Sequence, residues 1–254
     1  MRGVTVRAAV DLQKRIIGGE PCERPYHVKL RAVAARGSHK LCGGSLISDK
    51  WILTAAHCFE TGRTMYASVN AAQEVKITAN PVIYKDDNNR PHDIMLLQLP
   101  NSTDIQPVAL PDSLDSKPCL KIGKTIQIAG QGATKGGPNN KREPGESPTL
   151  HCADFEVVSC ENLNKTLQQT YPRIYKVKAY QHWFCGQTPG MDICFGDSGG
   201  GVVHGNKIFG VISFLGNAQN VCAKASAYMD VCNDKYFSWI RETISHSQLG
   251  GARV

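Results

Sequence analysis

The sequence predicts an all-β protein built from two strand-rich modules. Short apolar runs rich in Val, Ile and Thr alternate with Gly, Asn and Asp, which is typical of antiparallel barrels and sandwiches. The runs fall into two groups, separated by a connecting segment at Leu114–Lys124. A chain of 254 residues that is 41% hydrophobic can bury the core of one large unit or two modest ones. We therefore expect two β modules of similar size with a cleft between them.

The expected strands are short and are bounded by turn residues, as strands of such modules are. The first group comprises Val28–Val33, Gly44–Ser48, Trp51–Ala55, Ala67–Val69, Glu74–Thr78 and Ile94–Leu99. The second group comprises Thr125–Ala129, Phe155–Val158, Gly201–His204, Lys207–Phe214 and Ser226–Met229.

Two segments are expected to be helical and one to be an exposed loop. Glu161–Thr170 is predicted to form a short helix, and Asp234–Ile244 spaces its apolar residues three and four apart, as an amphipathic helix does. Lys135–Pro148 is rich in Gly, Pro, Asn and charged residues and has no hydrophobic period. It is predicted to be a loop open to proteolysis, and Gln248–Val254 is expected to fray.

These patterns divide the chain into five segments. We expect a leader at 1–15, the first module at 16–118, the second at 119–235, a helix at 236–246 and a tail at 247–254. The leader carries Arg2 and Arg7 but lacks the apolar stretch of a signal peptide, so it is interpreted as a propeptide or an added start. No run approaches the roughly eighteen apolar residues of a membrane span, and none is predicted.

The cysteines and the charge indicate the compartment. Ten cysteines without a C-x-x-C pair argue against zinc ribbons and redox motifs and favour five disulfides made in an oxidising compartment, in a secreted or granule-stored protein. The sequons at Asn101 and Asn164 agree with glycosylation on that route. The formal charge of +7 allows attraction to polyanions, although a solvated basic surface is the simpler interpretation. No basic cluster interleaved with aromatic residues predicts nucleic-acid binding.

The segment Gly196–Gly200 places the hydroxyl of Ser198 between glycines. Glycines permit a tight turn that exposes a nucleophile and points backbone N–H groups at the same spot. A serine is inert unless a base accepts its proton and a third group orients that base. The motif therefore predicts a partner histidine and a partner carboxylate elsewhere in the chain.

Two upstream residues fit these roles. His57 stands among small residues, and a bridge between Cys42 and Cys58 would clamp the backbone beside it. Asp93 precedes a strongly apolar segment, where a carboxylate needs a strong partner because desolvating it alone is costly. Taken singly, a histidine is more often a surface or core residue and such an aspartate more often faces solvent. In this context we expect His57 to be the base and Asp93 its partner.

The basic pair Lys14 and Arg15 directly precedes Ile16 and two glycines. A cut after Arg15 would free the amine of Ile16, and the glycines would let the new terminus turn inward. A buried ammonium group is costly unless it is paired with an opposite charge, and Asp197 beside Ser198 is the expected partner. The alternative, a dibasic surface stretch, is disfavoured by the sequence that follows.

Together these stretches resemble the chymotrypsin/trypsin family of serine proteases over Ile16–Ser245. The matching motifs stand in family order at Ile16–Gly19, Cys42–Ile47, Ala55–Cys58, Asp93–Leu97, Gly196–Gly200 and Trp239–Ile240. The resemblance implies two six-stranded antiparallel β-barrels with the active site between them and a C-terminal helix. It also implies protein or peptide substrates, an activating protease, protein protease inhibitors and no cofactor, and we expect a monomer.

The resemblance assigns roles residue by residue. Ser198 would be the nucleophile, His57 the general base and then acid, and Asp93 the group that orients His57. The backbone N–H groups of Gly196 and Ser198 would form the oxyanion hole. Ser213 matches the family's serine that hydrogen-bonds the triad aspartate.

The resemblance also implies the disulfide pairing. By family position the bridges are Cys42–Cys58, Cys22–Cys152, Cys160–Cys185, Cys194–Cys222 and Cys119–Cys232. One further trypsin bridge is missing, and both of its positions are non-cysteine here, one near Gln127 and the other at His204. The paired loss leaves no orphan thiol.

Asp192, six residues before Ser198, stands where trypsin has the floor of its primary specificity pocket. A carboxylate there would select Arg or Lys, because an uncharged side chain would leave it unpaired. Leu215 and Ser226 stand where trypsin has two wall glycines, although Gly216 could take the place of the first. Side chains at both positions would narrow the pocket, as in elastase. We expect restricted cleavage after Arg or Lys, with elastase-like cleavage after small residues as an alternative.

Several positions depart from the family pattern. Gly130–Gly132 contains Gln where the family has Trp, Gly201 replaces a proline, and the bulky Phe195 flanks the pocket mouth. The calcium loop of trypsin is not reproduced at Asn70–Glu74, so no metal dependence is expected.

Two functions are consistent with these residues. The first is a secreted serine endopeptidase made as a zymogen, and the second is a catalytically weak or inactive homologue that acts as a binding or signalling protein. The complete triad favours the enzyme. Phe214, in the strand that lines the cleft, and the basic surface favour a granule or immune protease over a digestive trypsin.

Overall fold

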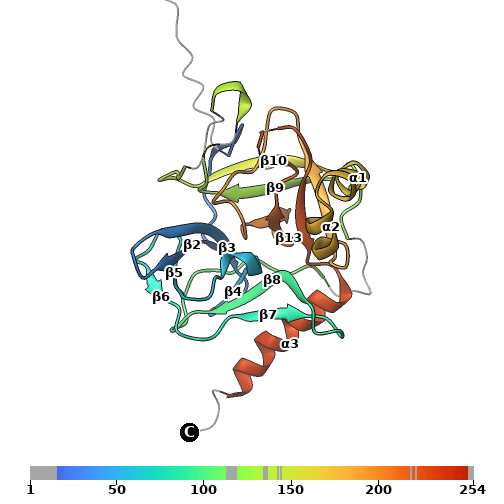
Figure 1. Ribbon diagram of the computed structural model, residues 1–254. Coiled ribbons are helices and arrows are strands. Elements are labelled where there is room, and N and C mark those ends of the chain that lie inside the picture. Colours follow the sequence, from blue (N-terminus) through green and yellow to red (C-terminus); the bar gives the residue numbers. More distant parts are fainter. Residues whose placement is uncertain are drawn as a thin grey trace, which may run out of the picture.

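The computed structural model describes residues 16–112, 119–133, 137–141, 143, 145–217, 219–220 and 222–250. The predicted leader, including Arg15, and residues 251–254 lie outside the described residues. Two strand-rich modules lie against each other, and a C-terminal helix runs along the lower one (Figure 1). The all-β class with two β modules and a C-terminal helix is confirmed.

The first module is an antiparallel sheet with the strand order β6-β5-β2-β3-β4-β8-β7. Its strands are β2 (His27–Ala34), β3 (His39–Leu46), β4 (Trp51–Thr54), β5 (Arg63–Val69), β6 (Val75–Lys76), β7 (Val82–Lys85) and β8 (Pro91–Gln98). The central strand β2 pairs along nearly its whole length with both β3 and β5. Within the described ranges no ladder joins β6 to β7, so this sheet is a half-barrel and not the closed barrel that the family resemblance implies.

The second module closes into a barrel. Its strands are β9 (Thr125–Gly130), β10 (His151–Val158), β11 (Trp183–Gln187), β12 (Gly201–His204), β13 (Lys207–Phe214) and β14 (Ser226–Asp230). They follow the order β10-β11-β14-β13-β12-β9, and a second ladder between β10 and β9 completes the ring. The short strand β1 (Glu20–Pro21) extends the sheet at β10. The predicted six-stranded barrel is thus formed by the second half of the chain.

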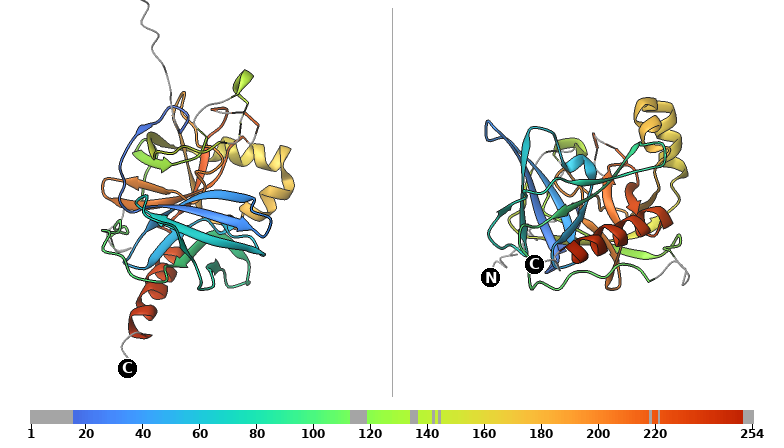
Figure 2. Two further views of the ribbon diagram at one scale, coloured as in Figure 1. Left: turned by 90° about the vertical axis from the view of Figure 1, so that its left-hand side faces the viewer. Right: turned by 90° about the horizontal axis from the view of Figure 1, so that it is seen from below.

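The helices match the prediction in part. Helix α1 (Glu161–Thr170) is confirmed at both ends, and α3 (Asp234–Gly250) runs beyond its predicted end into the segment expected to fray. Helix α2 (Pro172–Lys178) was not predicted; its proline stands at the first helical turn, where the missing N–H costs nothing. Figure 2 shows α1 and α2 together at one edge of the second module. No helix among the described residues is long and apolar enough to cross a bilayer.

Three strands, β1, β7 and β11, were also missed by the prediction. They are short, with two, four and five residues. Such runs carry little periodicity of their own, so their pairing with distant strands decides their conformation. The strand β11 pairs with both β10 and β14 and completes the closed barrel.

One hydrophobic core crosses the boundary between the modules. Buried residues of the first module, among them Leu53 and Leu96, share a cluster with Val211 of β13. Tyr236 and Ile240 of α3 belong to the same cluster, so the helix also packs on the first module. Because the interior is continuous, the two modules form one body, and the position of the cleft between them is determined by core packing.

Three of the predicted disulfides are present: Cys22–Cys152, Cys42–Cys58 and Cys160–Cys185. The prediction for Cys119 and Cys232 is wrong for this structure, because both are thiols and the Cys119 Sγ lies 3.7 Å from the carbonyl oxygen of Cys232. Burial and the neighbouring Cys119 thiol raise the pKa of Cys232, which disfavours the thiolate. The predicted bridge between Cys194 and Cys222 is likewise not among the disulfides of the described residues.

Asp230, the last residue of β14, is an ionisable group in a largely buried position. Burial raises the pKa of Asp230 to about 6, and the negative charge of Asp234 adds to this. The backbone N–H of Cys232, 3.0 Å from the Asp230 carboxylate, opposes the shift only in part. The native state therefore binds the Asp230 proton more tightly than the unfolded chain does.

Replacing Asp230 with Asn should stabilise the protein above pH 6. Since the folded pKa is raised to about 6, the wild type loses stability as pH rises through that value. Asp230→Asn should raise the free energy of unfolding at about pH 8 by about 2–3 kcal/mol, and the gain should vanish below about pH 4. Thermal unfolding over this range measures it. Asp104→Asn at an exposed position is the control, and a gain that is independent of pH would contradict the prediction.

Candidate active site

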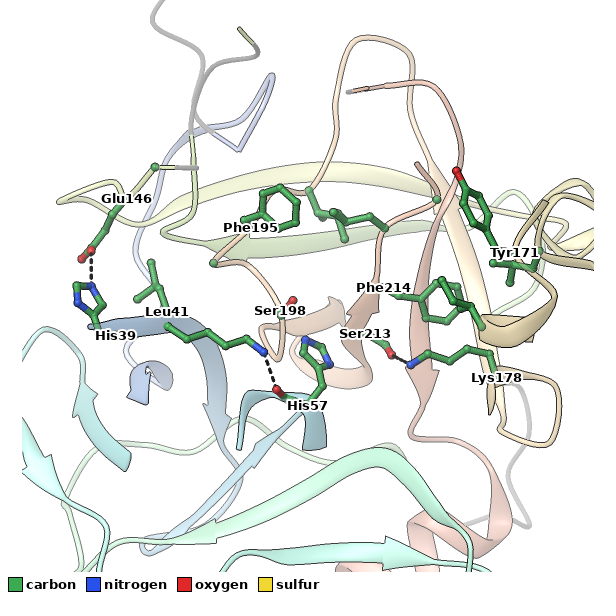
Figure 3. Close-up of a pocket in the computed structure, with 18 residues that line it drawn as sticks. His39, Leu41, His57, Glu146, Tyr171, Lys178, Phe195, Ser198, Ser213 and Phe214 are labelled. Carbon is green, nitrogen blue, oxygen red and sulfur yellow. Dashed lines mark hydrogen bonds and ion pairs between the residues drawn. The ribbon is translucent and has the colours of Figure 1, made fainter. Parts of the chain in front are cut away.

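A cavity of ≈ 910 Å³ lies where the two modules meet. The first module contributes His39, Leu41 and His57 to its wall, and the second contributes Ser198 and Phe214. These side chains surround a common space in Figure 3, and Lys178 of α2 approaches it from the side opposite His39. The apolar part of the wall consists of Leu41, Leu167, Ile174, Ile193, Phe195, Phe214 and Leu215.

His57 lies in a short 3-10 helix at Ala56–Cys58, just after β4. The Cys42–Cys58 disulfide ties this turn to β3, as predicted. The Lys40 ammonium group also donates a hydrogen bond to the backbone carbonyl of His57 at 2.7 Å. The backbone of His57 is therefore held from two sides, while its imidazole faces the cavity.

Asp93 lies in β8 with only 6% of its side chain exposed. Its Oδ1 accepts a hydrogen bond from the backbone N–H of His57 at 2.9 Å, and its Oδ2 lies 2.9 Å from His57 Nδ1. The Ser213 hydroxyl donates to the same Oδ2. Burial alone would raise the pKa of Asp93, but His57, the Lys178 charge and Ser213 together hold it below its ordinary value. Asp93 is thus a buried carboxylate in contact with the Nδ1 side of the imidazole.

Lys178, at the end of α2, contacts the same carboxylate, and the sequence predicts no role for it. Its Nζ lies 3.0 Å from Asp93 Oδ2 and 3.4 Å from Ser213 Oγ, and its side chain is 14% exposed. The ammonium also lies 4.8 Å from the ring centroid of Phe214. No motif marks Lys178, because its contact depends on how α2 packs against β8.

Ser198 stands in a turn shaped by glycines. Gly196 and Gly199 have φ values of 102° and 83°, a region that only glycine adopts readily. A Cβ on Gly199 would lie 2.2 Å from the Thr54 hydroxyl, so a side chain there would also clash. The carbonyl oxygen of Ser198 accepts from Gly43 N at 2.7 Å and lies 3.6 Å from Cys58 Sγ. These contacts hold the Ser198 turn against the His57 turn.

The predicted oxyanion hole lies in this turn. Gly196 and Ser198, whose N–H groups are expected to form it, both line the cavity. The other amides of the turn have backbone partners: Asp197 N donates to Cys194 O at 3.1 Å, Gly199 N to Ile212 O of β13 at 2.7 Å and Gly200 N to Asp197 O at 3.0 Å. The role of the Gly196 and Ser198 amides stays a prediction.

Asp197 is fully buried beneath the turn. Its two carboxylate oxygens accept hydrogen bonds from Gly132 N and Cys194 N, each at 2.8 Å. A Cβ on Gly130 would lie 1.9 Å from Asp197 Oδ1, which explains why this segment needs small residues. The side chain of Ile16 is 1% exposed and packs in the core of the second module. The predicted pairing of a free Ile16 amine with Asp197 stays a prediction.

Asp192 is also buried, with 1% of the residue exposed. Its Oδ1 accepts from Ile193 N at 2.8 Å and from the Ser226 hydroxyl at 3.3 Å, and its Oδ2 accepts from Cys222 N at 2.7 Å. Asp192 N donates to Ile17 O at 3.0 Å, so the start of the described chain is bonded to this residue. Asp192, expected at the pocket floor, and Ser226, expected at the pocket wall, are therefore brought together by the fold.

Leu215 and Gly216 both line the cavity, which bears on the alternatives left open for the pocket wall. A Cβ on Gly216 would lie 1.9 Å from the carbonyl oxygen of Ala225, so only glycine fits there. The Leu215 side chain packs against the core of the second module. Phe195 is 46% exposed and also lines the cavity.

The two predicted glycosylation sites and one cluster of possible metal ligands are the other candidate sites. Asn101 is exposed and Asn164 is half-buried on α1. The side-chain donor atoms of Cys42, His57 and Cys58 lie within 4.8 Å of one another, as in a metal site. Because the two sulfurs are joined in a disulfide, neither can bind a metal as a thiolate.

A double-mutant cycle should reveal the coupling between Asp93 and Lys178. Asp93→Asn leaves the Lys178 ammonium without its counter-charge. The substitution should therefore lower the free energy of unfolding more in the wild type than in the Lys178→Met variant. Urea unfolding of the four proteins should give a coupling free energy of about 1–3 kcal/mol. The exposed Glu161–Lys165 pair on α1 is the control and should show coupling near zero. Equal coupling for both pairs would contradict this.

Comparisons with known proteins identify the family of the chain. The family model described as Trypsin matches residues 16–240. The chain is 33% identical to Trypsin-3 of Salmo salar, covering 92% of this chain and 95% of that protein, and 31% identical to Trypsin V-A of Rattus norvegicus, covering 93% and 92%. It is 28% identical to Kallikrein-8 of Mus musculus, covering 91% and 87%. The chain therefore belongs to the trypsin family of serine proteases.

Proposed function

We propose that the protein is a serine endopeptidase in which Ser198, His57 and Asp93 form the catalytic triad. The observation that carries the proposal is the contact of His57 Nδ1 with the buried Asp93 carboxylate at 2.9 Å, beside a cavity that Ser198 also lines. With Nδ1 directed at Asp93, the Nε2 atom is available to a hydroxyl on the cavity side.

In the proposed reaction the Ser198 oxygen attacks the peptide carbonyl carbon while His57 Nε2 takes the hydroxyl proton. The negative charge on the tetrahedral intermediate is stabilised by the N–H groups of Gly196 and Ser198. His57 then donates the proton to the leaving amine, and the C–N bond breaks to leave an acyl-enzyme. A water molecule, deprotonated by His57, attacks the ester, releases the carboxylic acid and restores Ser198.

The enzyme is made as a zymogen in this proposal and is activated by an activating protease that cuts after Arg15. The buried Ile16 side chain and the fully buried Asp197 carboxylate support an inward position for the new terminus. The hydrogen bond from Asp192 N to Ile17 O further links this terminus to the pocket floor. Cleavage thereby orders the turn that holds Ser198 and the pocket together.

The proposed specificity is restricted cleavage after Arg or Lys, because Asp192 places a carboxylate at the expected pocket floor. A second candidate, cleavage after small apolar residues, is favoured by a specific observation. Both Asp192 oxygens already accept hydrogen bonds from Ile193, Cys222 or Ser226, and Asp192 itself is not among the residues that line the cavity.

We also propose that the protein is a secreted or granule-stored monomer, regulated by protein protease inhibitors. The three disulfides found in the described part of the chain suit an oxidising compartment. The exposed Asn101 and the half-buried Asn164 are the proposed glycosylation sites.

Labelling with a fluorophosphonate or sulfonyl fluoride should modify Ser198 and only weakly modify other serines. The probe forms a stable bond to an activated serine, so labelling depends on the triad and on cleavage after Arg15. Mass spectrometry of tryptic peptides locates the label, and Ser198→Ala should abolish it, whereas Ser102→Ala should not. A cleaved and folded protein that stays unlabelled would support the inactive-homologue alternative.

Profiling the cleaved enzyme with peptides varied before the scissile bond should show the strongest turnover after Arg and Lys. Asp192→Ser should then lower kcat/KM for the basic peptides by at least about 100-fold and leave apolar peptides less affected, because the charge partner is lost. Turnover by the wild type after small apolar residues alone would reject the Arg/Lys proposal and leave the endopeptidase proposal intact.

A further inference from the structure

We propose that Lys178 is a positioning residue that competes with His57 for the Asp93 carboxylate and so extends the activity of the enzyme toward lower pH. This inference rests on the proposed triad. Lys178 belongs to none of the motifs that predict the triad. The inference follows from the contact of Lys178, at the end of α2, with Asp93.

Three donors converge on one oxygen atom. Asp93 Oδ2 lies 2.9 Å from His57 Nδ1 and 3.0 Å from Lys178 Nζ, and the Ser213 hydroxyl donates to it as well. Figure 3 shows Lys178 extended toward Ser213 along the wall of the cavity. Two groups that carry or acquire a positive charge therefore share a single buried carboxylate.

Hydrogen bonds around the end of α2 determine the position of the Lys178 backbone. The side-chain amide of the buried Gln181 donates to Val177 O at 2.7 Å, and its oxygen accepts from Asp93 N at 2.8 Å. The Trp183 indole donates to Lys178 O at 3.0 Å. The Gln181 side chain thus links Val177 of α2 to the backbone of the aspartate that Lys178 contacts.

This arrangement has a cost and a benefit for catalysis. When His57 takes the serine proton, the imidazolium and the Lys178 ammonium contact the same carboxylate oxygen. The two positive charges repel each other. The repulsion destabilises the imidazolium that forms during the reaction, and this lowers the maximal rate. The same repulsion acts on any positive charge that the imidazole acquires, whether the proton comes from Ser198 or from solvent.

Other charged groups near the triad act on different atoms. Lys40 on β3 donates to the backbone carbonyl of His57 and not to its ring. His39, on the same strand, lies 3.8 Å from Glu146 at the opposite wall. Further titratable groups among the described residues are Tyr171 of the cavity wall, His92 of β8 with its partner Asp86, and the buried Tyr236 of α3. Burial lowers the pKa of His92 and raises that of Tyr236, so both stay neutral around pH 7.

The test is the pH dependence of kcat/KM for the full chain cleaved after Arg15 by immobilised trypsin. Ser198→Ala, treated in the same way, measures any trypsin that is carried over. Lys178→Met should move the acid limb upward by about 1 pH unit and raise the plateau, because the imidazolium no longer shares Asp93. Lys178→Arg should keep the acid limb of the wild type, since it retains the charge.

Lys176→Met is the matched control, because Lys176 is exposed on the same helix and has no contact with Asp93 in the described structure. Its acid limb should not move. If Lys178→Met fails to fold, as judged by thermal unfolding, Lys178→Gln replaces it. The rate of Ser198 labelling by a fluorophosphonate over the same pH range gives a second readout that is independent of substrate binding.

The outcomes separate the two proposals. An acid limb that shifts in Lys178→Met or Lys178→Gln, but not in Lys178→Arg or Lys176→Met, supports the inference. An active enzyme whose acid limb is the same in all variants overturns the role of Lys178 and leaves the proposed triad standing. A cleaved, folded wild type with neither turnover nor labelling overturns the proposed function, and this inference with it.

Discussion

The arrangement of the cleft depends on one buried carboxylate, that of Asp93. A charge that is 6% exposed is stable only where donors replace the lost water. These donors come from three elements far apart in the chain: His57 from the 3-10 helix, Ser213 from β13 and Lys178 from α2. The contacts that keep Asp93 ionised therefore bring both modules and helix α2 to one point.

Two further buried carboxylates organise the loop that carries Ser198. Asp197 is bound by the amides of Gly132 and Cys194, and Asp192 by those of Ile193 and Cys222. Because these donors are backbone amides, each hydrogen bond to a carboxylate fixes the position of the main chain and so gives the loop a defined shape. Their positions rely on neighbouring glycines, since a Cβ on Gly130 would displace the Asp197 carboxylate.

Most of the strands and the triad candidates could be predicted because their signals are local. Gly196–Gly200 needs its glycines for the turn itself, and α1 has an apolar period of its own. The shorter β11 is set by pairing with β10 and β14. The bridge expected for Cys119 and Cys232 depends on how two distant segments meet, and here they meet as thiols.

The sequence by itself determined the all-β class, the division into two modules and the residue types needed for serine chemistry, because turn residues, periodicity and short motifs act over a few residues. Tertiary structure alone decided that the first sheet stays open, that Asp192 is bound by main-chain amides, and that Lys178 reaches Asp93. The contacts of Asp192 and Lys178 join residues far apart in the chain, with 30 residues between Asp192 and Cys222 and 85 between Asp93 and Lys178. A long-range contact of this kind satisfies a buried charge, and no local pattern in the chain encodes it.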